Sequence, residues 1–351
     1  MTSSIRIFNL TCSQVTPMRL FRATLWPFSF LLGSILHFRH FLFSVGILRS
    51  KKAVVTSIVI GNLKIGGTGK TPFAIWLIEK LDASKTGFVS RGYGRKTKGF
   101  QLITSESNVS EIGDEPAVVR NHFQSLIGAV SENRLSGIYQ LKQSFPQIQQ
   151  VVLDDAFQHR KVKAGFNILL TTYDNLYVND FLLPAGDLRE SKNGAKRADF
   201  IIVTKCPLEL NEEERDALIT KIKPLNHQQV FFSSINYADV VKSSYESKKL
   251  ADISDFTLVT GIANANTLVE YLRNRNLKFE HLNFQDHHNF TLKDVEQLSK
   301  NNLIITTEKD FMRLQKFEVL IGKLFYLPIH VKIDNSEIFN DLIKNFVTTK
   351  L

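Results

Sequence analysis

Short apolar runs alternate with longer amphipathic stretches along most of the chain after residue 52. The runs are rich in β-branched residues and end at glycine or polar residues, which is typical of buried strands. Predicted strands are 54–60, 88–90, 126–130, 151–153, 168–171 and 200–204, and predicted helices include 71–81, 134–142 and 212–223. Short buried strands separated by helices predict an α/β fold with a mostly parallel sheet covered by helices on both faces.

The same alternation recurs nearer the C-terminus. Strands are predicted at 257–260, 278–282 and 303–306, and helices at 267–273 and 292–300. The intervening residues 239–254 are polar and rich in Ser, Tyr and Lys, which favours a hinge. We therefore expect a core at 53–238, a hinge at 239–254, and a smaller second α/β lobe at 255–351.

The N-terminal part departs from this pattern. Residues 1–17 are polar and without period, so we expect a disordered extension, and Met18 is a plausible internal start. Residues 25–48 are strongly apolar, but Pro27 and a polar group around Arg39 break the run below the 20 or so residues that a spanning helix requires. No small-residue cleavage site follows, which disfavours a secretory signal.

At helical spacing, the apolar segment carries one narrow polar stripe, formed by Ser29, Gly33, His37, His40 and Ser44. Basic residues flank the segment on both sides, which suits an anionic lipid surface. The pattern favours a monotopic, membrane-associated helix within 18–52. A buried core helix and a true span are the alternatives.

Charge and cysteine content narrow the function classes. Lys and Arg exceed Asp and Glu by 44 − 34 = 10, which favours an anionic partner such as a phosphorylated small molecule, a nucleic acid or an acidic membrane. The basic residues are dispersed and match no nucleic-acid-binding signature, so we expect no nucleic-acid partner. The two cysteines are isolated, which disfavours both a disulfide framework and a zinc site.

The strongest motif lies between the first predicted strand and the helix at 71–81. It consists of Gly66, Gly67, Thr68, Gly69, Lys70 and Thr71. In this context the pattern is typical of a phosphate-binding loop (P-loop), whose glycine amides and lysine hold phosphates and whose hydroxyl ligates Mg²⁺. Lys64 replaces the usual first glycine, and three glycines downstream compensate. The motif predicts ATP and Mg²⁺ as ligands.

Carboxylates supply candidate metal and proton-transfer groups. Asp154 and Asp155 end a predicted strand, where either could hold Mg²⁺, although a simple strand cap is the alternative. Asp114 and Glu115 lie in a turn framed by glycine and proline, which we expect to lie outside helix and strand interiors. One could accept a hydroxyl proton and the other reach the metal; an acidic surface turn is equally compatible. His287 could orient a carboxylate.

Three further loops carry cations or polar groups at predicted strand ends, where α/β folds bind ligands. They contain Arg91, then Gln158 with His159, and then Arg189.

Together these segments resemble the tetraacyldisaccharide 4′-kinase family, the lipid A 4′-kinases of Gram-negative bacteria. The resemblance runs from about residue 18 to about residue 314. In chain order it rests on 46–50, 61–62, 66–72, 90–94, 113–116, 153–159, 183–186, 189–190, 286–287 and 307–310.

The resemblance implies transfer of the ATP γ-phosphoryl group to the 4′-hydroxyl of tetraacyldisaccharide 1-phosphate, giving lipid IVA. It implies a P-loop core, a smaller second lobe and a membrane-associated N-terminal helix at the cytoplasmic face of the inner membrane. Anionic lipid and the lipid A precursor are the implied partners. A P-loop kinase or ATPase with a soluble phosphorylated substrate, a nucleic-acid-binding NTPase and a nucleotide-gated scaffold are the rival functions.

The resemblance also implies roles for residues. Asp114 would accept the hydroxyl proton, with His287 as its dyad partner. Lys70 and the P-loop amides would hold the phosphates, and Thr71, Glu115 and one of Asp154 and Asp155 would organise Mg²⁺. The positions matching family loops around the sugar and phosphate groups are Arg91, Arg134, Gln158, His159 and Arg189.

Overall fold

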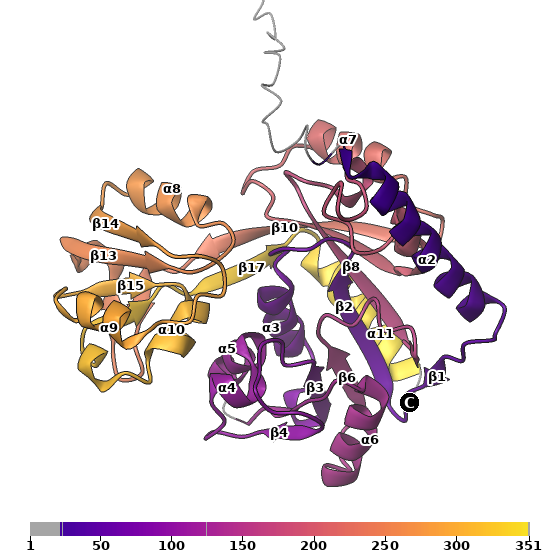
Figure 1. The fold of residues 1–351 in the computed structure, drawn as a ribbon, viewed down its shortest axis with the longest axis horizontal. Coiled ribbons are helices and arrows are strands. Elements are labelled where there is room, and N and C mark those ends of the chain that lie inside the picture. Colours follow the sequence, from indigo (N-terminus) through magenta and orange to yellow (C-terminus); the bar gives the residue numbers. More distant parts are fainter. Residues whose placement is uncertain (1–21, 23, 124, 350–351) are drawn as a thin grey trace, which may run out of the picture.

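The computed structural model describes residues 22, 24–123 and 125–349. The extension predicted at 1–17 lies outside these residues. The elements form two α/β lobes, shown side by side in Figure 1, one built on a nine-stranded sheet and the other on a six-stranded sheet. The predicted α/β fold with a smaller second lobe is therefore confirmed.

The sheet of the first lobe is mostly parallel. Its strands lie in the order β17 (Ile329–Ile333), β10 (Gln229–Tyr237), β9 (Phe200–Thr204), β8 (Phe166–Thr172), β2 (Thr56–Asn62), β6 (Gln150–Leu153), β3 (Thr86–Ser90), β5 (Ile127–Val130) and β4 (Gln101–Ile103). Only the edge strands β17 and β4 pair antiparallel. The carboxyl ends of the parallel strands consequently meet at one edge, where the P-loop follows β2 and the aspartate pair follows β6.

Alternate residues of β2 pack on opposite faces of this sheet, as the period of a strand requires. Ile58 and Ile60 belong to the apolar core on one face, which includes residues from α3 (Lys70–Lys80), α5 (Asp114–His122) and α11 (Ser336–Thr349). Val59 belongs to the core on the other face, with residues from α6 (Arg134–Ser144) and α7 (Glu212–Ile222). Helices cover both faces, as predicted.

The sheet of the second lobe has the order β12 (Ser247–Lys249), β11 (Val240–Lys242), β16 (Leu324–Tyr326), β15 (Ile304–Thr306), β13 (Asp255–Thr260) and β14 (Lys278–Asn283). Its helices are α8 (Asn266–Asn274), α9 (Leu292–Ser299) and α10 (Glu308–Leu314). The smaller elements of the chain are α4 (Val109–Ile112), the paired strands β1 (Lys51–Lys52) and β7 (Val162–Lys163), and 3₁₀ turns at Ala83–Lys85, Tyr177–Asn179, Lys192–Arg197, Leu250–Asp252 and Glu318–Leu320.

Two predicted boundaries of the second lobe are wrong. The expected hinge at 239–254 contains β11 and β12, which belong to the six-stranded sheet. The second lobe also ends before residue 351, because β17 and α11 return to the first lobe. The chain crosses between the lobes along β10 and β17, which pair antiparallel and lie side by side in Figure 1.

The N-terminal helix α2 (Trp26–Ser44) lies along the outside of the first lobe. Part of the predicted polar stripe faces the protein: the Ser29 hydroxyl donates to the Leu182 carbonyl at 2.9 Å, and the His40 Nε2 lies 3.0 Å from Glu190 Oε1. His37 and Ser44 of the same stripe are exposed. No helix in the described part of the chain is long and apolar enough to cross a membrane.

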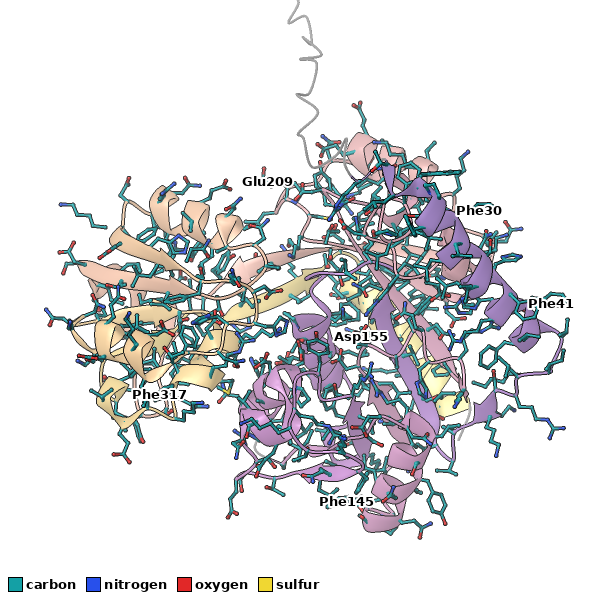
Figure 2. All side chains as sticks on the ribbon, viewed as in Figure 1. Phe30, Phe41, Phe145, Asp155, Glu209 and Phe317 are labelled. Atoms are coloured by element: carbon teal, nitrogen blue, oxygen red, sulfur yellow. The ribbon has the colours of Figure 1, made fainter. Side chains whose placement is uncertain are left out.

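Large apolar side chains of α2 are exposed to solvent. They are Trp26, Phe28, Phe30, Leu31, Ile35, Phe38 and Phe41. Figure 2 labels two of them, Phe30 and Phe41, at the outer edge of the molecule. Such a contiguous apolar surface is unusual for a protein that contacts only water.

Candidate active site

The predicted P-loop connects β2 to α3. Gly66 and Gly69 have φ values of +100° and +82°, a region that side chains rarely allow, and Gly69 caps the N-terminus of α3. Lys70 and Thr71 lie in the first turn of this helix. The amides of a first helical turn lack partners within the helix, so this terminus is suited to bind phosphate.

Asn62 braces the P-loop from the end of β2. Its fully buried amide donates to the Thr68 hydroxyl at 2.9 Å, and its backbone carbonyl accepts from Gln158 Nε2 at 2.6 Å. Arg189 donates to the Asn62 Oδ1. The sequence motif at 61–62 includes Asn62 but does not predict this bracing role. A polar residue closing an otherwise apolar strand was the available signal.

The two aspartates that follow β6 have different surroundings. Asp155 pairs with Arg189, whose Nη1 lies 3.1 Å from Asp155 Oδ2, and with Lys70, whose Nζ lies 3.6 Å from Oδ1. Burial opposes ionisation of Asp155, but these cations bring its pKa below the ordinary value. Figure 2 labels Asp155 in the middle of the first lobe.

Asp154 is 3% exposed, and its Oδ1 has no hydrogen-bond partner among the described residues. Burial, together with the smaller effects of the negative charges of Asp155 and Glu115, raises the pKa of Asp154 to about 6. A buried carboxylate oxygen without a partner, beside a phosphate-binding loop, is suited to bind a cation.

Arg134 and His159 lie close to this aspartate pair. The Arg134 Nη2 donates to the Asp154 carbonyl at 3.3 Å, and burial lowers the pKa of Arg134 to about 10. Burial also lowers the pKa of His159 to about 4, with further contributions from cations that include Arg134 and Arg91. His159 is therefore neutral at neutral pH. Arg91 is itself exposed.

The prediction that Asp114 and Glu115 lie in a turn outside the helices is wrong, because both residues form the first turn of α5. Gly113 caps this helix with φ +89°, and a Cβ there would lie 2.7 Å from the Tyr93 carbonyl oxygen. The glycine therefore makes the sharp entry into α5 possible. Carboxylates are favoured in a first helical turn by the helix dipole.

Asp114 meets the second lobe directly. Its Oδ2 lies 2.9 Å from His287 Nδ1, as the predicted dyad requires, and Arg313 Nε donates to its Oδ1 at 2.9 Å. Burial by itself raises the pKa of Asp114, but hydrogen bonds from Arg313 and His287 and the charges of Arg313 and Lys309 hold that pKa well below its usual range. The carboxylate is therefore ionised.

Glu115, adjacent to Asp114, is also paired with the second lobe. Lys309 Nζ donates to Glu115 Oε1 at 2.8 Å and lies 3.3 Å from His287 Nε2. The sequence alone did not predict roles for Lys309 and Arg313 at this site. The 307–310 motif was the available signal, since Lys309 belongs to it and Arg313 follows one helical turn later.

The structure thus brings the predicted residues, apart from the exposed Arg91, into two groups. One, at the carboxyl ends of β2 and β6, contains the P-loop, the aspartate pair, Arg134, Gln158, His159 and Arg189. The other, between the lobes, contains Asp114, Glu115 and His287. The effect of Glu115 on the pKa of Asp154 shows that the two groups interact electrostatically. A phosphate-binding loop beside an Asp–His pair is suited to phosphoryl transfer to a hydroxyl group.

Comparison with known proteins agrees with this geometry. Residues 21–348 match the family model described as tetraacyldisaccharide-1-P 4′-kinase. The chain belongs to this family. It is therefore a kinase, and the resemblance noted in the sequence is confirmed.

Curated relatives support the same family. A tetraacyldisaccharide 4′-kinase from Flavobacterium johnsoniae is 45% identical over 89% of this chain and 93% of its own length. Another from Bacteroides thetaiotaomicron is 40% identical over 92% of each chain. A crystal structure of LpxK from Aquifex aeolicus in complex with ATP is 29% identical, with a TM-score of 0.76 over 93% of this chain and 99% of its own.

Proposed function

We propose that this kinase transfers the γ-phosphoryl group of ATP to the 4′-hydroxyl of tetraacyldisaccharide 1-phosphate, yielding lipid IVA. The observation that carries the proposal is the Asp114–His287 pair beside the P-loop, in a chain whose family is described by this acceptor and this position. The ATP complex of the Aquifex aeolicus relative supports ATP as the donor.

In the proposed reaction, Lys70 and the first-turn amides of α3 hold the β- and γ-phosphates. The 4′-oxygen forms a bond to the γ-phosphorus while the bond to the β–γ bridging oxygen breaks, and ADP leaves. Asp114 accepts the hydroxyl proton, and His287 orients that carboxylate. Because the Asp114 pKa is held low, the proton moves late, when the new O–P bond has already acidified the hydroxyl.

Mg²⁺ is expected with a nucleotide at such a loop, and the residues present fit it. Asp154 offers a partnerless buried oxygen, whereas both oxygens of Asp155 contact Arg189, so we assign direct ligation to Asp154. Thr71 and Glu115 are further oxygen donors. The described residues contain no group of three or more His, Cys, Asp or Glu suited to a metal. Mg²⁺ usually needs only one or two carboxylates with substrate phosphates, and it neutralises phosphate charge.

We further propose that α2 lies in the interface of the inner membrane, on its cytoplasmic face, where ATP is available. The exposed apolar face of α2 supports this proposal. A four-chain lipid resists leaving a bilayer, because each exposed CH₂ costs about 0.8 kcal/mol. The enzyme would therefore bind its acceptor at the bilayer surface.

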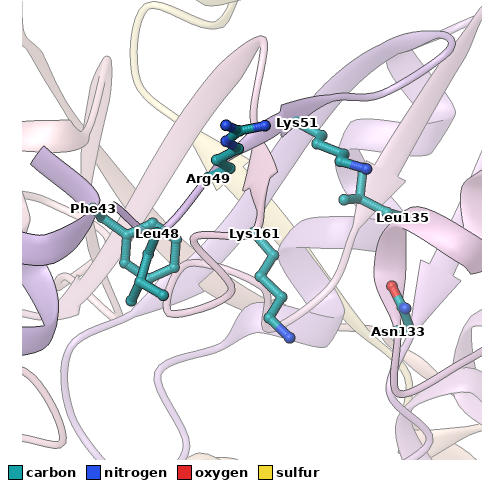
Figure 3. A pocket seen from close by; sticks show the side chains of 7 residues that line it. All are labelled: Phe43, Leu48, Arg49, Lys51, Asn133, Leu135 and Lys161. Atoms are coloured by element: carbon teal, nitrogen blue, oxygen red, sulfur yellow. The ribbon is translucent and has the colours of Figure 1, made fainter. Parts of the chain in front are cut away.

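A pocket of about 360 Å³ lies beside the C-terminal end of α2 and is lined by both apolar and cationic side chains (Figure 3). It is lined by Phe43, Leu48, Arg49, Lys51, Asn133, Leu135 and Lys161. Three of these side chains are apolar and three are cationic, and none of the described residues that line the pocket is acidic. This composition supports contact with the headgroup region of anionic lipid.

The deciding experiment is transfer of a radiolabelled γ-phosphate from Mg-ATP to tetraacyldisaccharide 1-phosphate in mixed micelles. We expect the wild type to label the lipid and Asp114→Ala to lose turnover while its ATP affinity changes little. Absence of labelled lipid, with ATP still bound and hydrolysed, would refute the acceptor and favour a soluble phosphorylated substrate. Normal turnover of Asp114→Ala would refute the role of Asp114.

A further inference from the structure

The helix α10 of the second lobe presents two cations to the start of α5. Lys309 and Arg313 are four residues apart, so they lie on the same face of α10. They pair with Glu115 and Asp114, respectively, which are neighbours in the first turn of α5. The 307–310 motif forms the start of α10, and the proposed reaction assigns it no role.

The Arg313 guanidinium holds both oxygens of Asp114. Its Nε donates to Oδ1 at 2.9 Å, and its Nη2 donates to Oδ2 and lies 3.1 Å from His287 Nδ1. A planar guanidinium that contacts two carboxylate oxygens at once fixes the rotation of that carboxylate, which a single hydrogen bond does not. The Arg313 side chain is 7% exposed, so water competes little for these contacts.

Arg313 is itself held on its other side. Its Nη1 donates to Asp310 Oδ1 at 3.1 Å and to the Gly261 carbonyl at 3.4 Å. Asp310 is fully buried, and its Oδ2 accepts from the Gly261 amide at 2.9 Å and from the Thr307 hydroxyl at 2.7 Å. The motif thus builds a rigid support behind the guanidinium.

We propose that Arg313 is a positioning residue for phosphoryl transfer, fixing the Asp114 carboxylate from the opposite lobe so that one oxygen stays aligned with both His287 and the acceptor hydroxyl. The inference rests on the proposed role of Asp114. Misplacing a reacting group by about 1 Å can cost about 100-fold in rate, so a clamp of this kind acts on turnover rather than on substrate affinity.

The test compares Arg313→Ala and Arg313→Lys with the wild type in the lipid phosphorylation assay. We expect Arg313→Ala to lower kcat by about 100-fold while KM for ATP and for the lipid changes less than about threefold. Guanidinium ion added to the assay should restore part of the kcat of Arg313→Ala and none of the kcat of Asp114→Ala. Arg313→Lys keeps the charge but not the fork, so it should retain an intermediate kcat.

Arg275→Ala is the matched control, because Arg275 also pairs with an aspartate in the second lobe, Asp239 at 2.6 Å, but at an exposed site. Its kcat should equal that of the wild type. A second readout is the Asp114→Asn/Arg313→Ala double variant, whose residual kcat should match that of Asp114→Asn alone, because Arg313 acts through Asp114.

A kcat of Arg313→Ala within about threefold of wild type would overturn the proposal. So would a double variant whose kcat falls by the product of the two single-variant losses. If thermal unfolding shows that Arg313→Ala does not fold, Arg313→Lys decides, and a wild-type kcat refutes the role. Failure of the proposed function is distinguishable, since it would appear as absent lipid labelling by the wild type or as full turnover of Asp114→Ala.

Discussion

His40 Nε2 lies 3.0 Å from Glu190 Oε1, joining the N-terminal helix to the loop that carries Arg189. The same carboxylate oxygen lies 2.6 Å from Arg197 Nη1, and the Glu190 side chain is only 2% exposed. Arg189, the preceding residue, contacts Asn62 and Asp155 at the P-loop. The outer helix and the nucleotide-binding loop therefore share one support, and Glu190 is at its centre.

Glu190→Gln should reduce the free energy of unfolding by about 2–4 kcal/mol near neutral pH, because it breaks a buried ion pair and leaves Arg197 without its partner charge. Hydrogen bonds from His40 and Arg197 bring the Glu190 pKa below its ordinary 4.5, although burial opposes them. The stabilisation is therefore present above about pH 4.5 and is lost as the pH falls through the folded-state pKa. Urea unfolding at neutral and at acidic pH measures both effects.

Glu213→Gln is the control for this variant, because Glu213 is an exposed glutamate in the first turn of α7. It should leave the free energy of unfolding within about 0.5 kcal/mol of wild type. Equal stabilities of Glu190→Gln and wild type at neutral pH would show that the buried ion pair contributes nothing.

Asp154→Asn should have the opposite effect on stability. The pKa of Asp154 is raised from 3.8 to about 6, so its contribution is present below about pH 3.8 and is lost as the pH rises through 6. Near pH 7.5, without nucleotide or Mg²⁺, the variant should be more stable than wild type by about 1–3 kcal/mol, because it removes a buried, unpaired charge. Thermal unfolding across this pH range is the measurement.

The same Asp154→Asn variant should lose phosphoryl transfer if Asp154 holds Mg²⁺. Added Mg²⁺ and ATP should stabilise it less than they stabilise the wild type, because at a given concentration a ligand that binds more weakly stabilises a protein less. A variant with full turnover would contradict the metal assignment, and one less stable at neutral pH would contradict the pKa argument.

Lys70→Ala should weaken ATP binding and also slow turnover, since Lys70 is proposed to contact phosphate in both the ground state and the transition state. We expect kcat/KM for ATP to fall by about 100-fold or more, the effect typical of losing one charged group that stabilises developing charge. Lys80→Ala, an exposed lysine at the far end of α3, is the control. Steady-state kinetics and a nucleotide-binding assay are the measurements. Unchanged ATP affinity of Lys70→Ala would contradict a contact between Lys70 and the phosphates.

Phe30→Glu on the exposed face of α2 should reduce cosedimentation with anionic vesicles, because a charge in the interface opposes insertion. Leu208→Glu is a matched control, because Phe30 and Leu208 are both 68% exposed but Leu208 belongs to the loop before α7 and not to α2. Turnover with an acceptor dissolved in detergent should change much less than vesicle binding. Equal binding of the two variants would contradict an interfacial role for α2.

Much of the first lobe could be predicted because its strands are buried on both faces and appear as continuous apolar runs. Phe200–Thr204 was predicted to the residue, and the P-loop position followed from the glycines between β2 and α3. The predicted hinge failed for the opposite reason. Strands such as Ser247–Lys249 are short, polar and at a sheet edge, so they carry no hydrophobic pattern.

The candidate site could be predicted only as separate groups. Motif residues indicate which side chains carry chemistry, but sequence spacing says nothing about contacts between distant helices. Arg313 and Asp114 meet because α10 of one lobe packs against α5 of the other. The contact between Glu190 and His40 could not be predicted for the same reason, since each residue lies on an element whose partner is set by tertiary packing.

The return of β17 and α11 to the first lobe has a consequence for the order in which the newly made chain can fold. Phe339 of α11 packs against Phe73 and Trp76 of α3, Ile343 belongs to the same apolar core, and β17 closes one edge of the large sheet. The larger lobe therefore remains incomplete on the ribosome until β17 and α11 have emerged, whereas the smaller lobe has all its strands earlier. A premature stop near residue 328 would thus leave the nucleotide-binding half, not the C-terminal half, with an open core.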